Sequence, residues 1–125
     1  MKKNINIKLY KDDILTNEYK HINSYYNDNV SYITDNIHSK ITNTSFIREN
    51  EEYKFNINLI KKTAYFLLKE KNVKLIIKVF ESSIKRTNNK IEIRYKIETE
   101  ESTTKIIIES EWLKWLVLLN KKNNI

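Results

Sequence analysis

The 125-residue chain contains no glycine, no proline and no cysteine. A phosphate-binding P-loop, a dinucleotide-binding turn and a nucleophile elbow all require glycine, because the backbone there must approach a ligand closely or turn sharply. Thiolate metal sites and redox-active cysteine pairs require cysteine. The sequence therefore excludes glycine-loop nucleotide chemistry and thiolate chemistry. It shows no catalytic motif, and it predicts a non-enzymatic protein without a cofactor.

Long apolar runs and metal-binding clusters are also missing. No segment approaches the roughly 20 apolar residues that a membrane-spanning helix needs, and the N-terminus leads into alternating polar and apolar residues instead of a signal peptide. We therefore expect a cytoplasmic location. His21 and His38 are the only histidines, and no third ligand follows at a recognisable spacing. Surface histidines are expected, and no metal site is predicted.

The residues that are abundant are lysine, asparagine and isoleucine, which together supply 57 of the 125 residues. All three have codons made only of A and T, so the composition is typical of an AT-rich genome. The net charge is +7, and residues 61–90 hold nine basic and two acidic residues, which accounts for the whole excess. Because codon bias favours lysine at any tolerant surface position, the basic charge is weak support for a nucleic-acid partner.

Period-two alternation of apolar and polar residues, the pattern of half-buried strands, dominates the chain. The clearest examples begin at Ile5, Tyr53 and Ile91. We expect an all-β, single-domain antiparallel meander over 1–125 that closes into a calycin-like or lipocalin-like barrel of about eight to ten strands. About nine strands are predicted, at 5–10, 19–26, 30–34, 40–48, 53–59, 63–69, 73–80, 91–98 and 103–111.

Asparagine-rich clusters separate many of these segments. Asparagine tolerates positive φ better than other non-glycine residues, because its short amide bonds to the local backbone. The sequence therefore predicts hairpin turns, with asparagine in the role of glycine, near 27–29, 49–51, 70–72 and 88–89.

Helical spacing occurs only near the C-terminus. Trp112, Trp115, Leu116 and Leu119 fall at i, i+3, i+4 and i+7. The segment 112–119 is compatible with a short helix, with a buried last strand, or with an interface that forms a homodimer through Trp112 and Trp115. A place in the barrel core is favoured, and an interfacial membrane anchor is the least favoured alternative.

Several strand patterns resemble the YwiB-like family of small bacterial proteins. Residues 90–97 (KIEIRYKI), a polar turn and 104–109 (TKIIIE) are similar to the closing hairpin of that family, and 3–8 (KNINIK) is similar to its first strand. The pairs 25–33 and 46–57 resemble its early aromatic hairpin and its mid-barrel strands. The resemblance implies a calycin-type barrel whose interior can hold a small apolar ligand, and it implies no reaction.

Tyr53, Phe55 and Tyr95 are the candidate ligand-binding residues. They lie in phase with the apolar face of their strands, so their rings should point into the barrel. A phenol buried in an apolar space needs a hydrogen-bond partner, which a ligand or water can supply. A barrel filled completely by its own side chains is the alternative, and the sequence alone favours it over a pocket.

Lys74, Lys78, Lys85 and Arg86 are the candidates for a different function. Cationic side chains interleaved with aromatic rings can bind single-stranded nucleic acid or another polyanion. An ordinary solvated lysine face is the simpler interpretation, because only one of the four is arginine.

We therefore expect a non-enzymatic cytoplasmic β-barrel protein of unassigned role, whose first candidate function is the binding of a small apolar ligand in the barrel. Polyanion binding through the 61–90 face is the main alternative, and an interaction protein that dimerises through its tryptophan-rich tail is the third.

Overall fold

A computed structural model of the chain describes residues 2–27, 29–87 and 89–110, and in this part of the chain all regular structure is β-strand. The ten strands are β1 (Lys2–Lys11), β2 (Ile14–Asn27), β3 (Asn29–Thr34), β4 (Ile37–Ile41), β5 (Ser45–Glu49), β6 (Tyr53–Asn58), β7 (Thr63–Leu68), β8 (Val73–Arg86), β9 (Lys90–Ile97) and β10 (Thr104–Glu109).

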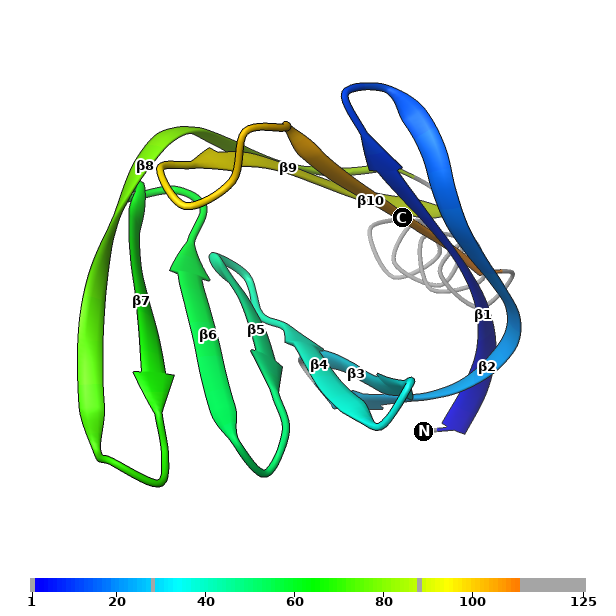
Figure 1. Cartoon of the computed structure of the whole chain (residues 1–125). Coiled ribbons are helices and arrows are strands. Elements are labelled where there is room, and N and C mark those ends of the chain that lie inside the picture. The colour runs from blue at the N-terminus through cyan, green and yellow to red at the C-terminus, as the bar shows by residue number, and fades with distance from the viewer. Residues whose placement is uncertain (1, 28, 88, 111–125) are drawn as a thin grey trace, which may run out of the picture.

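The strands form one closed antiparallel sheet (Figure 1). Each strand pairs with the next along the chain, and β1 closes the barrel by pairing with β10, with Asn6 opposite Glu109 and Lys11 opposite Thr104. The expected fold class, an antiparallel meander closed into a calycin-type barrel, is confirmed. Closure leaves no sheet edge running the full length of the barrel.

The predicted strand at 40–48 was wrong, because two strands occupy this region. The side-chain oxygen of Thr42 accepts hydrogen bonds from the backbone N–H groups of Thr44 (3.3 Å) and Ser45 (2.9 Å), and this turn separates β4 from β5. Threonine is enriched in strands, but its hydroxyl also stabilises local turns. Strands β2 and β8 are also longer than expected, at 14 residues each.

The four predicted turn regions all fall where one strand gives way to the next. Among their described residues, however, only Asn72 has positive φ, so the prediction that asparagine takes the role of glycine holds in one of the four. Asn36 and Asn72 have positive φ, and so do Asp12, Asp13 and Asp35. Two longer side chains also adopt positive φ: these are His21 and Lys62. Aspartate tolerates the left-handed region for the same reason as asparagine, since its short side chain can bond to nearby backbone.

The core lies inside the barrel and follows the pleat of the strands. Inward positions alternate along each strand, as in the sequence from Ile91 to Ile97, where every second residue is buried. Three register shifts keep the apolar residues of the long strands pointing inward. Two lie in the pairing of β1 with β2, between Ile5 and Ile7 and between Leu9 and Tyr10, and one lies in the pairing of β8 with β9, between Val79 and Glu81. The buried apolar residues are Ile5, Ile7, Val30, Tyr32, Ile41, Phe46, Phe55, Ile57, Leu59, Ala64, Ile77, Ile91, Ile93, Tyr95, Ile97, Ile106 and Ile108.

The tryptophan-rich segment 112–119 lies outside the described residues. Its helix, strand and interface interpretations, and the homodimer through Trp112 and Trp115, therefore stay predictions. Among residues 2–27, 29–87 and 89–110, no helix is long and apolar enough to cross a membrane.

Replacing the buried ring of Phe46 tests the packing of the core. Phe46 is 0% exposed, so Phe46→Ala should lower the free energy of unfolding by about 3–5 kcal/mol, through lost burial and a residual cavity. Phe80→Ala is the control, because Phe80 is 53% exposed, and its effect should stay within about 0.5 kcal/mol. Chemical denaturation measures both, and equal effects would contradict this core.

Candidate ligand cavity

A cavity of about 310 Å³ lies at one end of the barrel. In a meander, alternate turns fall at the same end, so the β5–β6 turn and the β9–β10 loop lie at one end. The cavity is lined there by Thr99 and Glu100 of the loop and by Arg48 and Tyr53, which flank the turn on β5 and β6. We call this the open end. The lining residues are Arg48, Tyr53, Phe55, Phe66, Ile77, Tyr95, Ile97, Thr99 and Glu100.

Aromatic rings form much of the cavity wall. Tyr53 stacks on Phe66 with 5.0 Å between ring centroids, and Phe55 contacts Tyr95 at 5.8 Å in a tilted arrangement. Tyr95 also contacts the buried Phe46 at 6.3 Å. The fold thus brings the three sequence-predicted residues, Tyr53, Phe55 and Tyr95, to the wall of one cavity. Their role in ligand binding stays a prediction.

The two buried tyrosines are held in their neutral form. Burial raises the pKa of Tyr32 to about 12, although a hydrogen bond with Ser39 and the charge of Arg48 act in the opposite direction. Burial also raises the pKa of Tyr95, and the charge of Glu100 adds to the effect. A hydrogen bond with Thr104 lowers it in part. Both hydroxyls therefore have protein partners and keep their protons at neutral pH.

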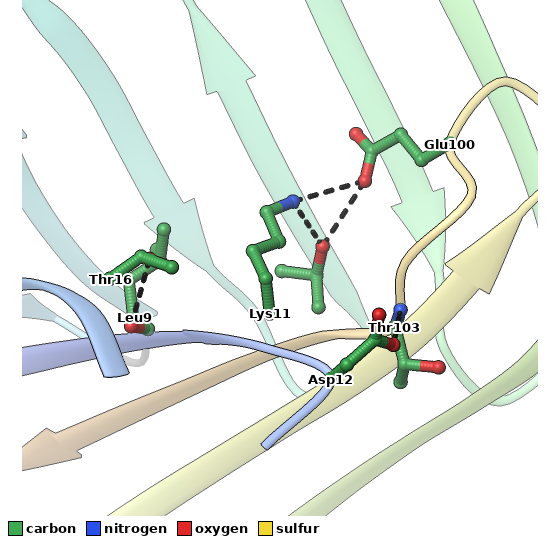
Figure 2. A network of polar contacts seen from close by, with 7 residues as sticks. Leu9, Lys11, Asp12, Thr16, Glu100 and Thr103 are labelled. Atoms are coloured by element: carbon green, nitrogen blue, oxygen red, sulfur yellow. Dashed lines mark hydrogen bonds and ion pairs between the residues drawn. The ribbon is translucent and has the colours of Figure 1, made fainter. Parts of the chain in front are cut away.

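A cluster of polar side chains fixes the rim of the cavity, as Figure 2 shows. Lys11 Nζ lies 3.1 Å from Glu100 Oε2 and donates a hydrogen bond to Thr104 Oγ1 at 2.6 Å. Nearby, Asp12 accepts a hydrogen bond from the Thr103 N–H at 2.9 Å and donates its own N–H to the Thr103 carbonyl at 3.0 Å. These contacts tie the β9–β10 loop, which carries Glu100, to the end of β1.

Arg48 is the one lining residue of the cavity that is a cation. It lies on the same face of β5 as the buried Phe46, and its neighbours across the sheet are the buried residues Ser39 and Phe55. Its side chain therefore points into the barrel. In the described part of the chain the guanidinium makes no hydrogen bond and no ion pair. The sequence analysis did not identify Arg48. The available signal was its position two residues after Phe46, which places both side chains on the same face of the strand.

The barrel wall is incomplete beside this cavity. Strand β8 pairs with β7 from Val73 onward, but its pairing with β9 starts only at Val79. Leu75 lies opposite the cavity residue Phe66 and in phase with the buried Ile77, yet it is 50% exposed. Apolar surface therefore continues from the cavity to the solvent along the first half of β8.

The candidate polyanion-binding residues do not share one surface. Lys74 Nζ lies 4.3 Å from the centre of the Tyr65 ring, and Lys78 Nζ lies 5.5 Å from that of Phe80. Lys85 follows the β8 bulge, and its neighbour on β9 is Glu92. Arg86 donates a hydrogen bond to the Thr42 carbonyl at 2.7 Å, at the barrel end opposite the cavity.

The two histidines lie beside a second hollow, on the side of the barrel formed by β2, β3 and β4. His21, His38, Tyr25 and Ile33 contribute to its lining, and its volume is about 600 Å³. No group of three or more potential metal ligands occurs among residues 2–27, 29–87 and 89–110. This hollow thus shows no metal-ligand set.

Comparison of the chain with protein-family models, with curated proteins and with solved structures finds no significant match. The resemblance to the YwiB-like family therefore stays a prediction from the strand patterns.

The buried tyrosines predict a loss of stability at alkaline pH. An unfolded tyrosine ionises near pH 10, whereas folding holds the pKa of Tyr32 at about 12. The stabilisation is complete below about pH 10 and is lost as the pH rises towards the folded pKa, because only the unfolded state then releases the proton. When the pH is raised, the ultraviolet absorbance of tyrosinate should rise in a last step at high pH, and this step should coincide with unfolding.

Tyr32→Phe should reduce that late step, and Tyr25→Phe, which removes an exposed ring, should leave it unchanged. Complete ionisation of all tyrosines in a still-folded protein would contradict this placement.

Proposed function

We propose that this protein is a non-enzymatic barrel protein that binds a small apolar ligand in the cavity at its open end. The observation that carries the proposal is a cavity of about 310 Å³ whose wall is built mainly from Tyr53, Phe55, Phe66, Ile77, Tyr95 and Ile97. Ligand sites are typically concave, apolar and of about 300–1,000 Å³, with a few polar groups. A barrel filled by its own side chains would leave no such space.

The size of the cavity limits the ligand. At about 30 Å³ for each water-sized group, the cavity has room for about ten non-hydrogen groups. An aliphatic chain of medium length or a single substituted ring matches this volume, whereas a long-chain lipid exceeds it. The exposed Leu75 lies on the part of β8 that pairs with β7 but not with β9, and it offers an apolar entrance to the cavity.

Two neighbouring residues on opposite faces of β8 test the proposal. Ile77 lines the cavity and is 6% exposed, whereas Ile76 is 74% exposed on the outer face. Ile77→Trp should fill the cavity and abolish binding of 1-octanol, and Ile76→Trp should leave the affinity within about twofold, since it touches no cavity surface. Calorimetric titration measures both affinities.

Amide chemical-shift mapping of the unchanged protein keeps the test independent of how the variants fold. Shifts caused by 1-octanol should concentrate around Phe55, Tyr95 and Ile97. No binding of 1-octanol, or shifts confined to the outer face, would overturn the proposal.

A second candidate, polyanion binding by the outer face of β7 and β8, has one observation in its favour. The ammonium groups of Lys74 and Lys78 make no ion pair in the described part of the chain, and each lies near an aromatic ring. Cations beside aromatic rings suit phosphate charge and base stacking, and Phe80 is the exposed ring of the two. We rank this second, because Arg86 lies elsewhere.

Charge reversal distinguishes a specific polyanion-binding site from non-specific attraction by the net positive charge of the protein. If it operates, the double variant Lys74→Glu and Lys78→Glu should elute from immobilised single-stranded DNA at clearly lower salt, because fewer counterions are released. The matched control, Lys20→Glu and Lys40→Glu, changes the net charge equally on β2 and β4. Equal loss of retention in both variants would reject a specific site.

A further inference from the structure

The position of Arg48 lowers the stability of the protein unless the guanidinium binds a partner. A guanidinium that leaves bulk water without an anionic or hydrogen-bonding partner loses hydration that the protein does not replace. Arg48 is half-buried, points into the barrel and has no such partner in the described part of the chain. The other two arginines are both engaged: Arg86 bonds to the Thr42 carbonyl, and Arg94 lies near Asp13 and Glu81.

The one acidic residue of the cavity wall already has a cationic partner outside the wall. Glu100 lines the same space, but its carboxylate is 3.1 Å from the ammonium of Lys11. The Lys11–Glu100 pair therefore leaves one uncompensated positive charge, that of Arg48. The hydroxyls of Tyr32 and Tyr95 are close enough to this charge for it to lower the pKa of each. A ligand that brings one negative charge would neutralise the site.

We propose that Arg48 binds the anionic head group of the ligand, so that the cavity selects small amphiphiles with a single carboxylate or similar monoanion. This inference rests on the proposed function, and it names the class of ligand. A planar guanidinium suits a carboxylate because two parallel N–H groups can bond to both oxygens. The apolar part of the ligand then contacts Phe55, Phe66 and Tyr95.

The geometry also gives the orientation of the ligand. Along β5, Arg48 lies one inward position nearer to the open end than the fully buried Phe46. The head group is therefore held near the mouth of the cavity, where water can still reach its outer oxygen, and the tail faces the aromatic wall. This arrangement desolvates the apolar part of the ligand and leaves part of the charge hydrated.

Octanoate and 1-octanol are suitable ligands for the test, because both match the cavity and they differ mainly in charge at neutral pH. The unchanged protein should bind octanoate more tightly than 1-octanol. Arg48→Gln should weaken octanoate binding by about tenfold to a hundredfold, through loss of charge-assisted hydrogen bonds. Binding of 1-octanol, which carries no charge, should weaken much less than binding of octanoate. The octanoate affinity of Arg48→Lys should lie between those of the unchanged protein and Arg48→Gln, because lysine keeps the charge but has no planar pair of N–H donors.

Arg94→Gln is the matched control, because it removes the same charge from the outer face of β9. It should leave the affinity for both ligands unchanged. Octanoate binding that survives Arg48→Gln, or that falls equally in Arg94→Gln, would overturn the assignment of Arg48 while binding of 1-octanol still supports the cavity. Failure of both ligands to bind would overturn the cavity proposal and this inference together.

Thermal unfolding of the ligand-free variants separates a binding role from a structural one. Because Arg48 has no partner in the described part of the chain, Arg48→Gln should unfold at the same or a higher temperature than the unchanged protein. A clear fall in the unfolding temperature would show that Arg48 stabilises the fold, and it would overturn the proposal.

Discussion

The pleat of a closed sheet decides what every strand of this barrel contributes to the interior. Side chains alternate in direction along a strand, so every second one points inward. When one residue of a strand lies in the core, the residue two positions further along therefore also points into the barrel, whatever its type. In β5 this rule places Phe46 in the core and Arg48 in the cavity. The three register shifts in the long strands serve the same requirement, because they change the alternation so that apolar residues continue to face inward.

The cavity exists because the strands that surround it differ in length. Strand β8 begins six residues before its pairing with β9 starts, so the wall on that side is incomplete and side chains in phase with the core, such as Leu75, reach the solvent. The rim at β1 and the β9–β10 loop is held by Lys11, Glu100 and Thr104. One side of the mouth is thus fixed by charge-assisted hydrogen bonds and the other by pairing with one neighbour alone. The proposed ligand would approach where the backbone is least restrained.

Alternation in the sequence predicted the fold class, most strands and the inward direction of Tyr53, Phe55 and Tyr95, because burial on one face of a strand leaves a period of two. The turn at Thr42 was missed because threonine is common in strands as well as in turns. The cavity could not be predicted, since it depends on where the pairing of β8 with β9 begins, and this register involves residues on both strands. Arg48 was not predicted because it lies outside the basic stretch 61–90, and the density of charge along a chain carries no information about which face of a strand a residue occupies.

The seam between β1 and β10 has a consequence for how the protein folds. Every other pairing in the described barrel joins strands that follow one another along the chain, whereas this one joins Asn6 to Glu109. Local hairpins close small loops, but the seam must close almost the entire chain, and such non-local contacts form slowly. The pair of Lys11 with Glu100 spans this seam. The rim of the cavity is therefore complete only after the last strand pair has formed, so an open meander lacks the finished site, and the appearance of ligand binding during refolding would mark the moment of closure.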